Sequence, residues 1–71
     1  MTKELALSLI EEISEVTPLA MEDSIEACAA DSLDFIFLTQ GIEKRIGVTI
    51  PNEELVKFET VGQMVEWIAC N

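Results

Sequence analysis

The sequence contains no histidine and no tyrosine, and only four lysine or arginine residues stand against 14 aspartate or glutamate residues. Without histidine, a serine or cysteine nucleophile has no imidazole base beside it, and a zinc ion lacks its commonest nitrogen ligand. The formal net charge of -10 also disfavours nucleic acid as a partner, because each phosphate contact requires a basic side chain. We therefore expect no hydrolytic catalysis, no metal site and no binding of nucleic acid.

Cysteine is also scarce, and the two that are present, Cys28 and Cys70, form no CxxC pair. In an intracellular chain they are expected to be free and to pack as small apolar residues, with a single disulfide as the alternative. No apolar run approaches the length of about 18 residues that spans a membrane, and the first residues lack the basic and apolar regions of a signal peptide. We therefore predict a mature cytoplasmic protein with no membrane span.

With 71 residues, 49% of them hydrophobic, and a mean hydropathy of +0.31, the chain is too apolar to be disordered. A domain of this size buries roughly 60% of its unfolded surface, so it forms a modest core and offers no deep, walled active site. We predict one domain over residues 1–71, a monomer without enzymatic activity.

Three segments carry apolar residues at helical spacing. The first covers residues 3–16 and stops before a proline, because the residue before proline avoids the helical conformation. The second covers about residues 32–46, and the third follows a capping box and runs to about residue 70. The expected buried stripes are Leu5, Leu9, Ile13 and Val16 in the first, Leu38, Ile42 and Ile46 in the second, and Val61, Met64, Val65 and Ile68 in the third.

The connections between these segments are unequal. A long one over residues 17–30 is expected to contain only a short helical turn at 23–28. Residues 48–51 form an extended connector, after which Asn52 is expected to cap a short helix over 53–58. The pattern predicts an all-α fold, a small bundle of three long helices plus one short helix.

The second helix begins with Asp31-Ser32-Leu33-Asp34. With Asp31 as the N-cap, the Ser32 hydroxyl lies where free N–H groups and the helix dipole favour an anionic substituent. The other interpretation of Ser32 is an ordinary polar residue at a helix start. The next four residues, 35–38, are all apolar and surround the helix, so at least one phenylalanine is expected to face away from the core.

Three motifs together resemble the acyl carrier protein family. Residues 30–34, Ala-Asp-Ser-Leu-Asp, are similar to the family's sequence around the serine that bears 4′-phosphopantetheine. Residues 46–54, Ile-Gly-Val-Thr-Ile-Pro-Asn-Glu-Glu, resemble the link into its short third helix, and residues 58–68 resemble its final helix. The motifs stand in the family's order and at its separations, and they cover nearly the whole chain.

The resemblance implies a carrier in which Ser32 receives 4′-phosphopantetheine from coenzyme A through a phosphopantetheinyl transferase. Asp31, Leu33 and Asp34 would be the motif that the transferase recognises. The arm would carry acyl groups as thioesters to acyl-transferring and chain-elongating enzymes of fatty-acid, lipid or polyketide biosynthesis, which would have basic or apolar docking patches. The candidates to line an acyl pocket between the helices are Leu33, Ile36, Leu38, Ile42, Ile50, Phe58, Val61 and Ile68.

Several positions depart from the family's usual pattern. Cys28 and Ala29 replace a leucine and a glycine, and Phe37 stands where an exposed glutamate is usual. Lys44 and Arg45 replace acidic residues near the end of the second helix. These departures change the charge of the face through which the family meets its partners.

A partner surface formed by Phe35, Phe37 and Gln40 is therefore expected, and we predict a specialised rather than a general carrier. Two alternatives stay open. One is an unmodified helical protein-interaction module that uses the face of Phe35 and Phe37. The other is a peptidyl or aminoacyl carrier, which uses the same arm.

Overall fold

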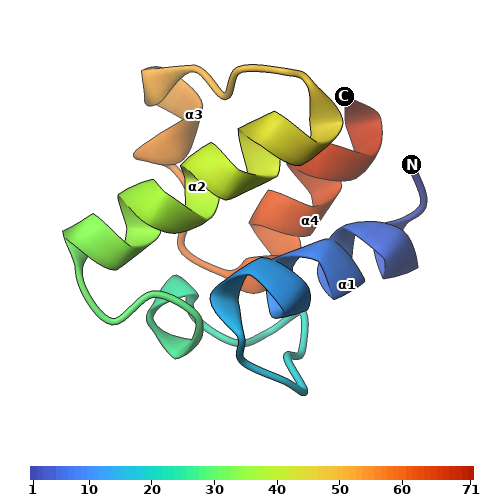
Figure 1. The fold of residues 1–71 in the computed structure, drawn as a ribbon. Helices are drawn as coiled ribbons and strands as arrows, with labels where there is room; N and C mark the ends of the chain where they lie inside the picture. The colour runs from blue at the N-terminus through green and yellow to red at the C-terminus, as the bar shows by residue number, and fades with distance from the viewer.

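The computed structural model describes residues 1–71 and has four α-helices, a single turn of 3₁₀ helix and no strand (Figure 1). The predicted all-α bundle of three long helices and one short helix is confirmed. Its dimensions are 24 × 23 × 19 Å. None of its helices is long and apolar enough to cross a membrane. The elements are α1 (Lys3–Ser14), η1 (Ile25–Ala27), α2 (Ser32–Ile46), α3 (Asn52–Leu55) and α4 (Val61–Cys70).

Helix α1 buries part of the predicted face, since Leu9 is buried and Ile13 packs against the core, but the other two predicted residues are not buried. Ala6 and Ile10 are fully buried, whereas Leu5 is 60% exposed. The helix ends at Ser14, since Glu15 adopts a left-handed conformation with φ of 60°. Val16 therefore lies beyond the helix and is half-exposed, so the expected stripe through Leu5 and Val16 was wrong. The prediction failed at Leu5 because a spacing of four residues placed this leucine on the core side, whereas in the structure the smaller Ala6 faces the core.

Helix α2 has the predicted bounds, and its ends explain them. At the start, the Asp31 side chain accepts a hydrogen bond from the backbone N–H of Asp34. At the end, Gly47 has φ of 73°, a conformation that glycine adopts without strain. In its middle, a Cβ added to Gly41 would lie 2.9 Å from Cγ2 of Ile13. The glycine therefore permits the close approach of α1 and α2.

The long connection before α2 is held against the start of α4 by backbone hydrogen bonds. The N–H of Gly62 donates to the carbonyl of Met21 at 2.8 Å, and the N–H of Val61 donates to that of Asp23 at 2.8 Å. A Cβ on Gly62 would lie 2.9 Å from the Met21 carbonyl oxygen, so glycine is required for this contact. The expected short helical turn is present as η1.

The short helix α3 starts and ends earlier than predicted. Pro51, rather than Asn52, precedes its first residue, and no side chain caps it. Proline fixes φ near the value that helix entry requires, so no cap is needed to set the chain direction. The helix ends at Leu55, and Val56, 82% exposed, has no core contact that would extend it.

Helix α4 matches its prediction. Thr60 and Gln63 form the capping box, and Val61, Met64, Val65 and Ile68 are all buried. These residues, with Ile10 and Ile42, are the largest side chains that the core encloses completely. Both cysteines are free. Cys28 packs in the core as expected, but Cys70 is exposed, because it lies at the last residue of α4 on the side turned to solvent.

Candidate functional site: the start of helix α2

Ser32 is the first residue of α2 and is exposed. Before it, Asp31 is fully extended, and its carboxylate accepts the Asp34 N–H at 2.9 Å while its carbonyl accepts the Phe35 N–H at 3.0 Å. Two bonds from one residue therefore fix the first turn of the helix. The predicted N-cap role of Asp31 is confirmed, and it sets the position from which the Ser32 hydroxyl projects.

The first turn leaves backbone donors free for an anionic group. Asp31 uses the N–H of Asp34, but a helix has no internal acceptor for the amides of Ser32 and Leu33. The helix dipole places partial positive charge at the same end, and the basic Lys44 and Arg45 lie in the last turn, at the opposite end. A phosphate on the Ser32 oxygen would lie beside the two free amides.

The surroundings of Ser32 do not activate it as a nucleophile. Its hydroxyl has no hydrogen-bond partner in the protein, and the sequence contains no histidine that could take its proton. No group of three or more potential metal ligands is brought together anywhere in the chain. The geometry suits a serine that another enzyme modifies.

An apolar pocket of about 290 Å³ opens beside Ser32, and we call it the Ser32 pocket. Its walls come from η1 and the segment after it, from the first turns of α2, and from α3 with the residues that follow. Phe35 and Phe58 supply its aromatic surface. The complete lining is Ile25, Glu26, Ala29, Ala30, Asp31, Ser32, Phe35, Leu55 and Phe58.

Only Phe58 of the eight residues expected to line an acyl pocket lies in the Ser32 pocket. Leu33 and Ile36 are 58% and 47% exposed and do not line this pocket, so their contact with an acyl chain stays a prediction. The helical period explains their exposure, because Phe35, between them in the sequence, occupies the inward position. The other five are buried in the core: Leu38, Ile42, Ile50, Val61 and Ile68.

The pocket residues that the sequence pattern missed are Ile25, Phe35 and Leu55. All three are partly buried and pack against the core. Ile25 begins η1 and Leu55 ends α3, two elements that are too short to carry a periodic signal. Their apolar character was visible in the sequence, but their meeting beside Ser32 depends on the tertiary fold.

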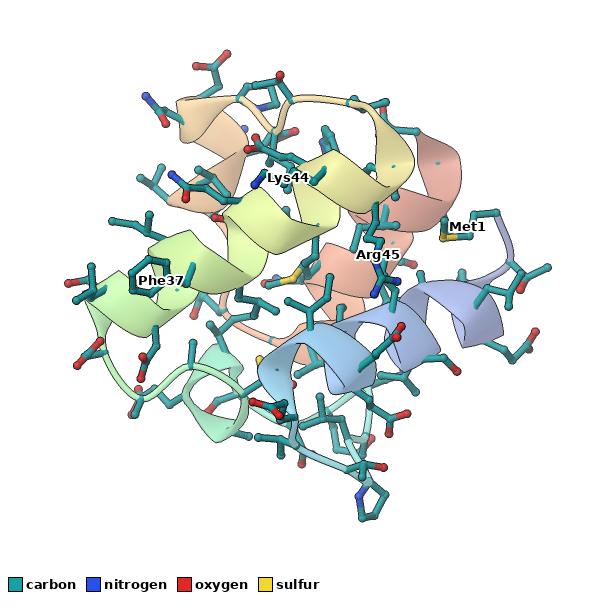
Figure 2. All side chains as sticks on the ribbon, in the orientation of Figure 1. Met1, Phe37, Lys44 and Arg45 are labelled. Carbon is teal, nitrogen blue, oxygen red and sulfur yellow. The ribbon has the colours of Figure 1, made fainter.

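The expected partner surface of Phe35, Phe37 and Gln40 does not form as a single patch. Residues two apart on a helix are rotated by about 200°, so Phe35 and Phe37 face in different directions. Phe35 packs against the core, whereas Phe37 is 62% exposed. Figure 2 shows Phe37 and Lys44 on the part of α2 turned to the viewer. Gln40, also exposed, lies about one turn from Phe37.

An ion pair and a buried thiol near α2 have shifted pKa values. The Arg45 guanidinium donates a 3.0 Å hydrogen bond to the Glu12 carboxylate, which lowers the pKa of Glu12 and raises the pKa of Arg45. Burial raises the pKa of the Cys28 thiol, and the thiol donates to the Ile25 carbonyl at 3.3 Å. The ion pair joins α1 to the end of α2, far from Ser32, and the thiol is protonated and sheltered.

Comparison with known proteins shows which family this chain matches. The model of the family described as the phosphopantetheine attachment site matches residues 4–68. An acyl carrier protein of Helicobacter pylori strain G27 is 38% identical over 58 residues, which cover 82% of this chain and 72% of that protein. An acyl carrier protein of Wolinella succinogenes is 40% identical over 47 residues, covering 66% of this chain and 62% of that protein, so this match spans less than two thirds of the relative. No solved structure matches at comparable significance.

The chain therefore belongs to the phosphopantetheine attachment site family. Proteins of this class are carriers and not catalysts, and the group that they carry is 4′-phosphopantetheine. A carrier domain implies contact with a phosphopantetheinyl transferase and with biosynthetic enzymes.

Proposed function

We propose that Ser32 is the residue to which 4′-phosphopantetheine is attached, and that the chain is an acyl carrier protein. The observation that carries the proposal is the position of Ser32, exposed as the first residue of a 15-residue helix that its neighbour Asp31 caps. The residues fit the group, because two free amides lie where its phosphate would be and an apolar pocket opens beside it.

The residues that this chain lacks determine which groups the transferase must supply for the attachment reaction. The Ser32 oxygen would form a bond to the phosphorus of the phosphopantetheine half of coenzyme A, while the pyrophosphate bond breaks and adenosine 3′,5′-bisphosphate leaves. The transferase has to supply the base that takes the serine proton, since no histidine is available here. When bound, the arm ends in a thiol that holds acyl groups as thioesters. Within this chain Asp31 holds the helix start, while Leu33 and Asp34 are exposed and offer an apolar and an acidic contact to the transferase.

The Ser32 pocket is proposed to shelter the acyl cargo. Its apolar walls would remove part of an acyl chain from water, a contribution of about 0.8 kcal/mol per buried CH₂. Phe35, Phe58 and Leu55 are only partly buried, so they have surface left to contact a ligand. The name of the relatives, acyl carrier protein, supports an acyl cargo, and we propose that this cargo is an intermediate of fatty-acid, lipid or polyketide biosynthesis.

The partners proposed are acyl-transferring and chain-elongating enzymes with basic or apolar docking patches. The net charge of -10 favours approach to a basic surface, and the exposed Phe37 and Gln40 add an uncharged area on α2. An apolar residue at this place suits a specialised carrier better than a general one. We propose that the chain acts as a monomer in the cytoplasm.

Intact mass spectrometry tests the proposal directly. After incubation with coenzyme A and a phosphopantetheinyl transferase, the chain is expected to gain the mass of one phosphopantetheine unit. Ser32→Ala should abolish the gain. Ser24→Ala is the matched control, because Ser24 is also exposed and its side chain makes no capping hydrogen bond. A mass gain that persists in Ser32→Ala, or no gain with several transferases, would contradict the assignment.

A further inference from the structure

An apolar groove of about 330 Å³ lies at the end of the molecule where α1 begins and α2 ends, and we call it the Leu5 groove. Its apolar lining residues are Met1, Leu5, Leu9 and Ile46. Figure 1 shows that the start of α1 and the end of α2 lie at the same end of the fold, and Figure 2 shows Arg45 extending from α2 toward α1 there. The groove shares no lining residue with the Ser32 pocket.

Most of the apolar surface of the Leu5 groove is left uncovered by the protein. Leu5 is 60% and Met1 57% exposed, while Leu9 is buried below them. Along α1 the lining extends from Leu5 to Glu12, which is about 10 Å or two helical turns. The groove therefore offers apolar surface over a length that suits two turns of a partner helix.

Arg45 has free hydrogen-bond donors at the polar side of the groove. Its Nη1 donates to the Glu12 carboxylate at 3.0 Å, and the guanidinium makes no other hydrogen bond in the protein. A guanidinium carries five N–H groups, and the Arg45 side chain is 52% exposed, so most of these donors face water. A second carboxylate can therefore bind Arg45 in the paired geometry that the two groups favour.

The charges at the Leu5 groove differ from those elsewhere on this acidic chain. Acidic residues outnumber basic ones in the lining of each of the other three pockets. Here Glu12 and Arg45 balance each other, and Lys44 is the one basic side chain that joins no ion pair. Glu4 is rotated by about 100° from Leu5 around α1, on the side away from the core. Charges farther than about 8 Å are screened at physiological salt, so a carboxylate meets a neutral to positive surface here.

We infer that the Leu5 groove is a docking site for an acidic amphipathic helix of a partner protein. One large apolar side chain of that helix would lie between Leu5 and Ile46, and a carboxylate one or two turns away would bind Arg45. About 20 Å along α2 separates Arg45 from Ser32, so a protein held in the groove leaves Ser32 accessible to other enzymes. The inference goes beyond the proposed function and does not need the arm.

A designed peptide tests this inference without a natural partner. The probe is a helical peptide of leucine, glutamate and alanine with its leucines on one face, titrated into the isotopically labelled chain and followed by NMR. Amide shifts are expected to centre on the first turns of α1 and the last turn of α2. A peptide of equal charge with serine in place of leucine should bind at least tenfold more weakly, because it cannot bury apolar surface. The net charge of -10 opposes nonspecific binding of either peptide.

Two pairs of variants at exposed residues locate the contacts. Leu5→Ser should weaken binding of the leucine peptide about tenfold or more, whereas Val56→Ser, at an even more exposed apolar residue, should leave it unchanged. Arg45→Gln should weaken binding about fivefold, whereas Lys57→Gln, which also removes a basic partner from an exposed ion pair, should have no effect. Glu12→Gln should tighten binding, because it frees Arg45 for the carboxylate of the peptide.

Several results would overturn the inference. They are an unchanged affinity in Leu5→Ser or Arg45→Gln, equal binding of the serine peptide, and weaker binding in Glu12→Gln. Self-association of the free chain that Leu5→Ser abolishes would assign the groove to a second copy instead, and binding of dodecanoate but not of the peptide would assign it to a small anionic amphiphile. Attachment at Ser32 is measured separately by mass, so failure of the proposed function would leave the docking site standing.

Discussion

Two pockets beside α2, the Ser32 pocket and one that we call the Phe37 pocket, share part of their lining and nevertheless differ in the side chain at their centre. The Phe37 pocket lies on the other flank of α2 and is lined by Phe37. Glu26, Ala29 and Ala30 line both, and the volumes are about 290 and 350 Å³. In the Ser32 pocket the aromatic residue on α2, Phe35, is packed against the core. In the Phe37 pocket it is 62% exposed. The aromatic side chain of the first pocket is thus part of the core, whereas that of the second faces solvent.

The second difference lies in the elements that complete each pocket. The Ser32 pocket is closed by Leu55 of α3 and by Phe58, and the Phe37 pocket by Ile13 and Val16 at the end of α1. A change in the position of α1 should therefore act on one pocket only. This separation would allow a single helix, α2, to serve the proposed covalent arm on one flank and a partner protein on the other.

Removing the two aromatic side chains in turn gives the largest effect expected. Phe35→Ala should lower the free energy of unfolding by about 2–3 kcal/mol, somewhat less than for a fully buried phenylalanine. Phe37→Ala should change it by no more than about 0.5 kcal/mol, because its side chain is mostly exposed. Urea denaturation of the two variants measures both values. Equal losses would mean that the two pockets do not differ in the way described.

A charge at Phe37 should separate partner contact from stability. Phe37→Glu is expected to slow transfer from the loaded chain to at least one acyl-transferring enzyme about tenfold, because a desolvated carboxylate opposes an apolar contact. Val56→Glu, which adds the same charge to another exposed site, is the control. Transfer rates come from single-turnover assays. Unchanged rates with every partner enzyme would refute the specialised carrier.

The parts of the fold that were predictable are those with local causes. The bounds of α2 follow from Asp31 at one end and Gly47 at the other, and the start of α4 follows from the capping box of Thr60 and Gln63. Each of these caps joins residues that are at most four positions apart, so it can be recognised from the sequence alone. The same holds for the exposed position of Ser32, since an N-cap fixes the first turn of its helix.

The parts that were not predictable depend on packing between distant segments. The buried face of α1 turned on whether Leu5 or Ala6 meets the core, and spacing by four could not distinguish them. The lining of the Ser32 pocket required Ile25 and Leu55 to meet Phe35. The contact of Gly62 with the Met21 carbonyl joins a loop to a helix 41 positions later. No periodic pattern records such contacts.

Loss of the cap should test whether Ser32 depends on a fixed helix start. Asp31→Ala removes the bond to the Asp34 N–H and should cost about 1 kcal/mol of stability. Thr60→Ala removes the corresponding bond at α4 and should cost about as much. Only Asp31→Ala is expected to slow attachment of the arm, measured by mass over time at matched folded fraction. If both variants load alike, the cap serves stability alone.

The smallest effect is expected from the ion pair between Glu12 and Arg45, which joins α1 to α2 at 3.0 Å. Arg45 lowers the pKa of Glu12, so the folded state binds a proton less readily than the unfolded state does. The contribution to stability is therefore present at neutral pH and lost as pH falls through the lowered pKa. Glu12→Gln should match the wild-type urea midpoint near pH 3 and fall slightly below it near pH 7 at low salt. Glu22→Gln, which breaks no ion pair, is the control.

The same substitution distinguishes the two pockets, because α1 lines the Phe37 pocket and not the Ser32 pocket. A slightly looser α1 should slow transfer to an enzyme that contacts Phe37 by a small factor and leave attachment of the arm unaffected. Both side chains of the pair are more than half exposed, and added salt should remove the difference between Glu12→Gln and the wild type. An equal effect on transfer and on attachment would show that α1 supports both flanks of α2, and the separation between the pockets would then fail.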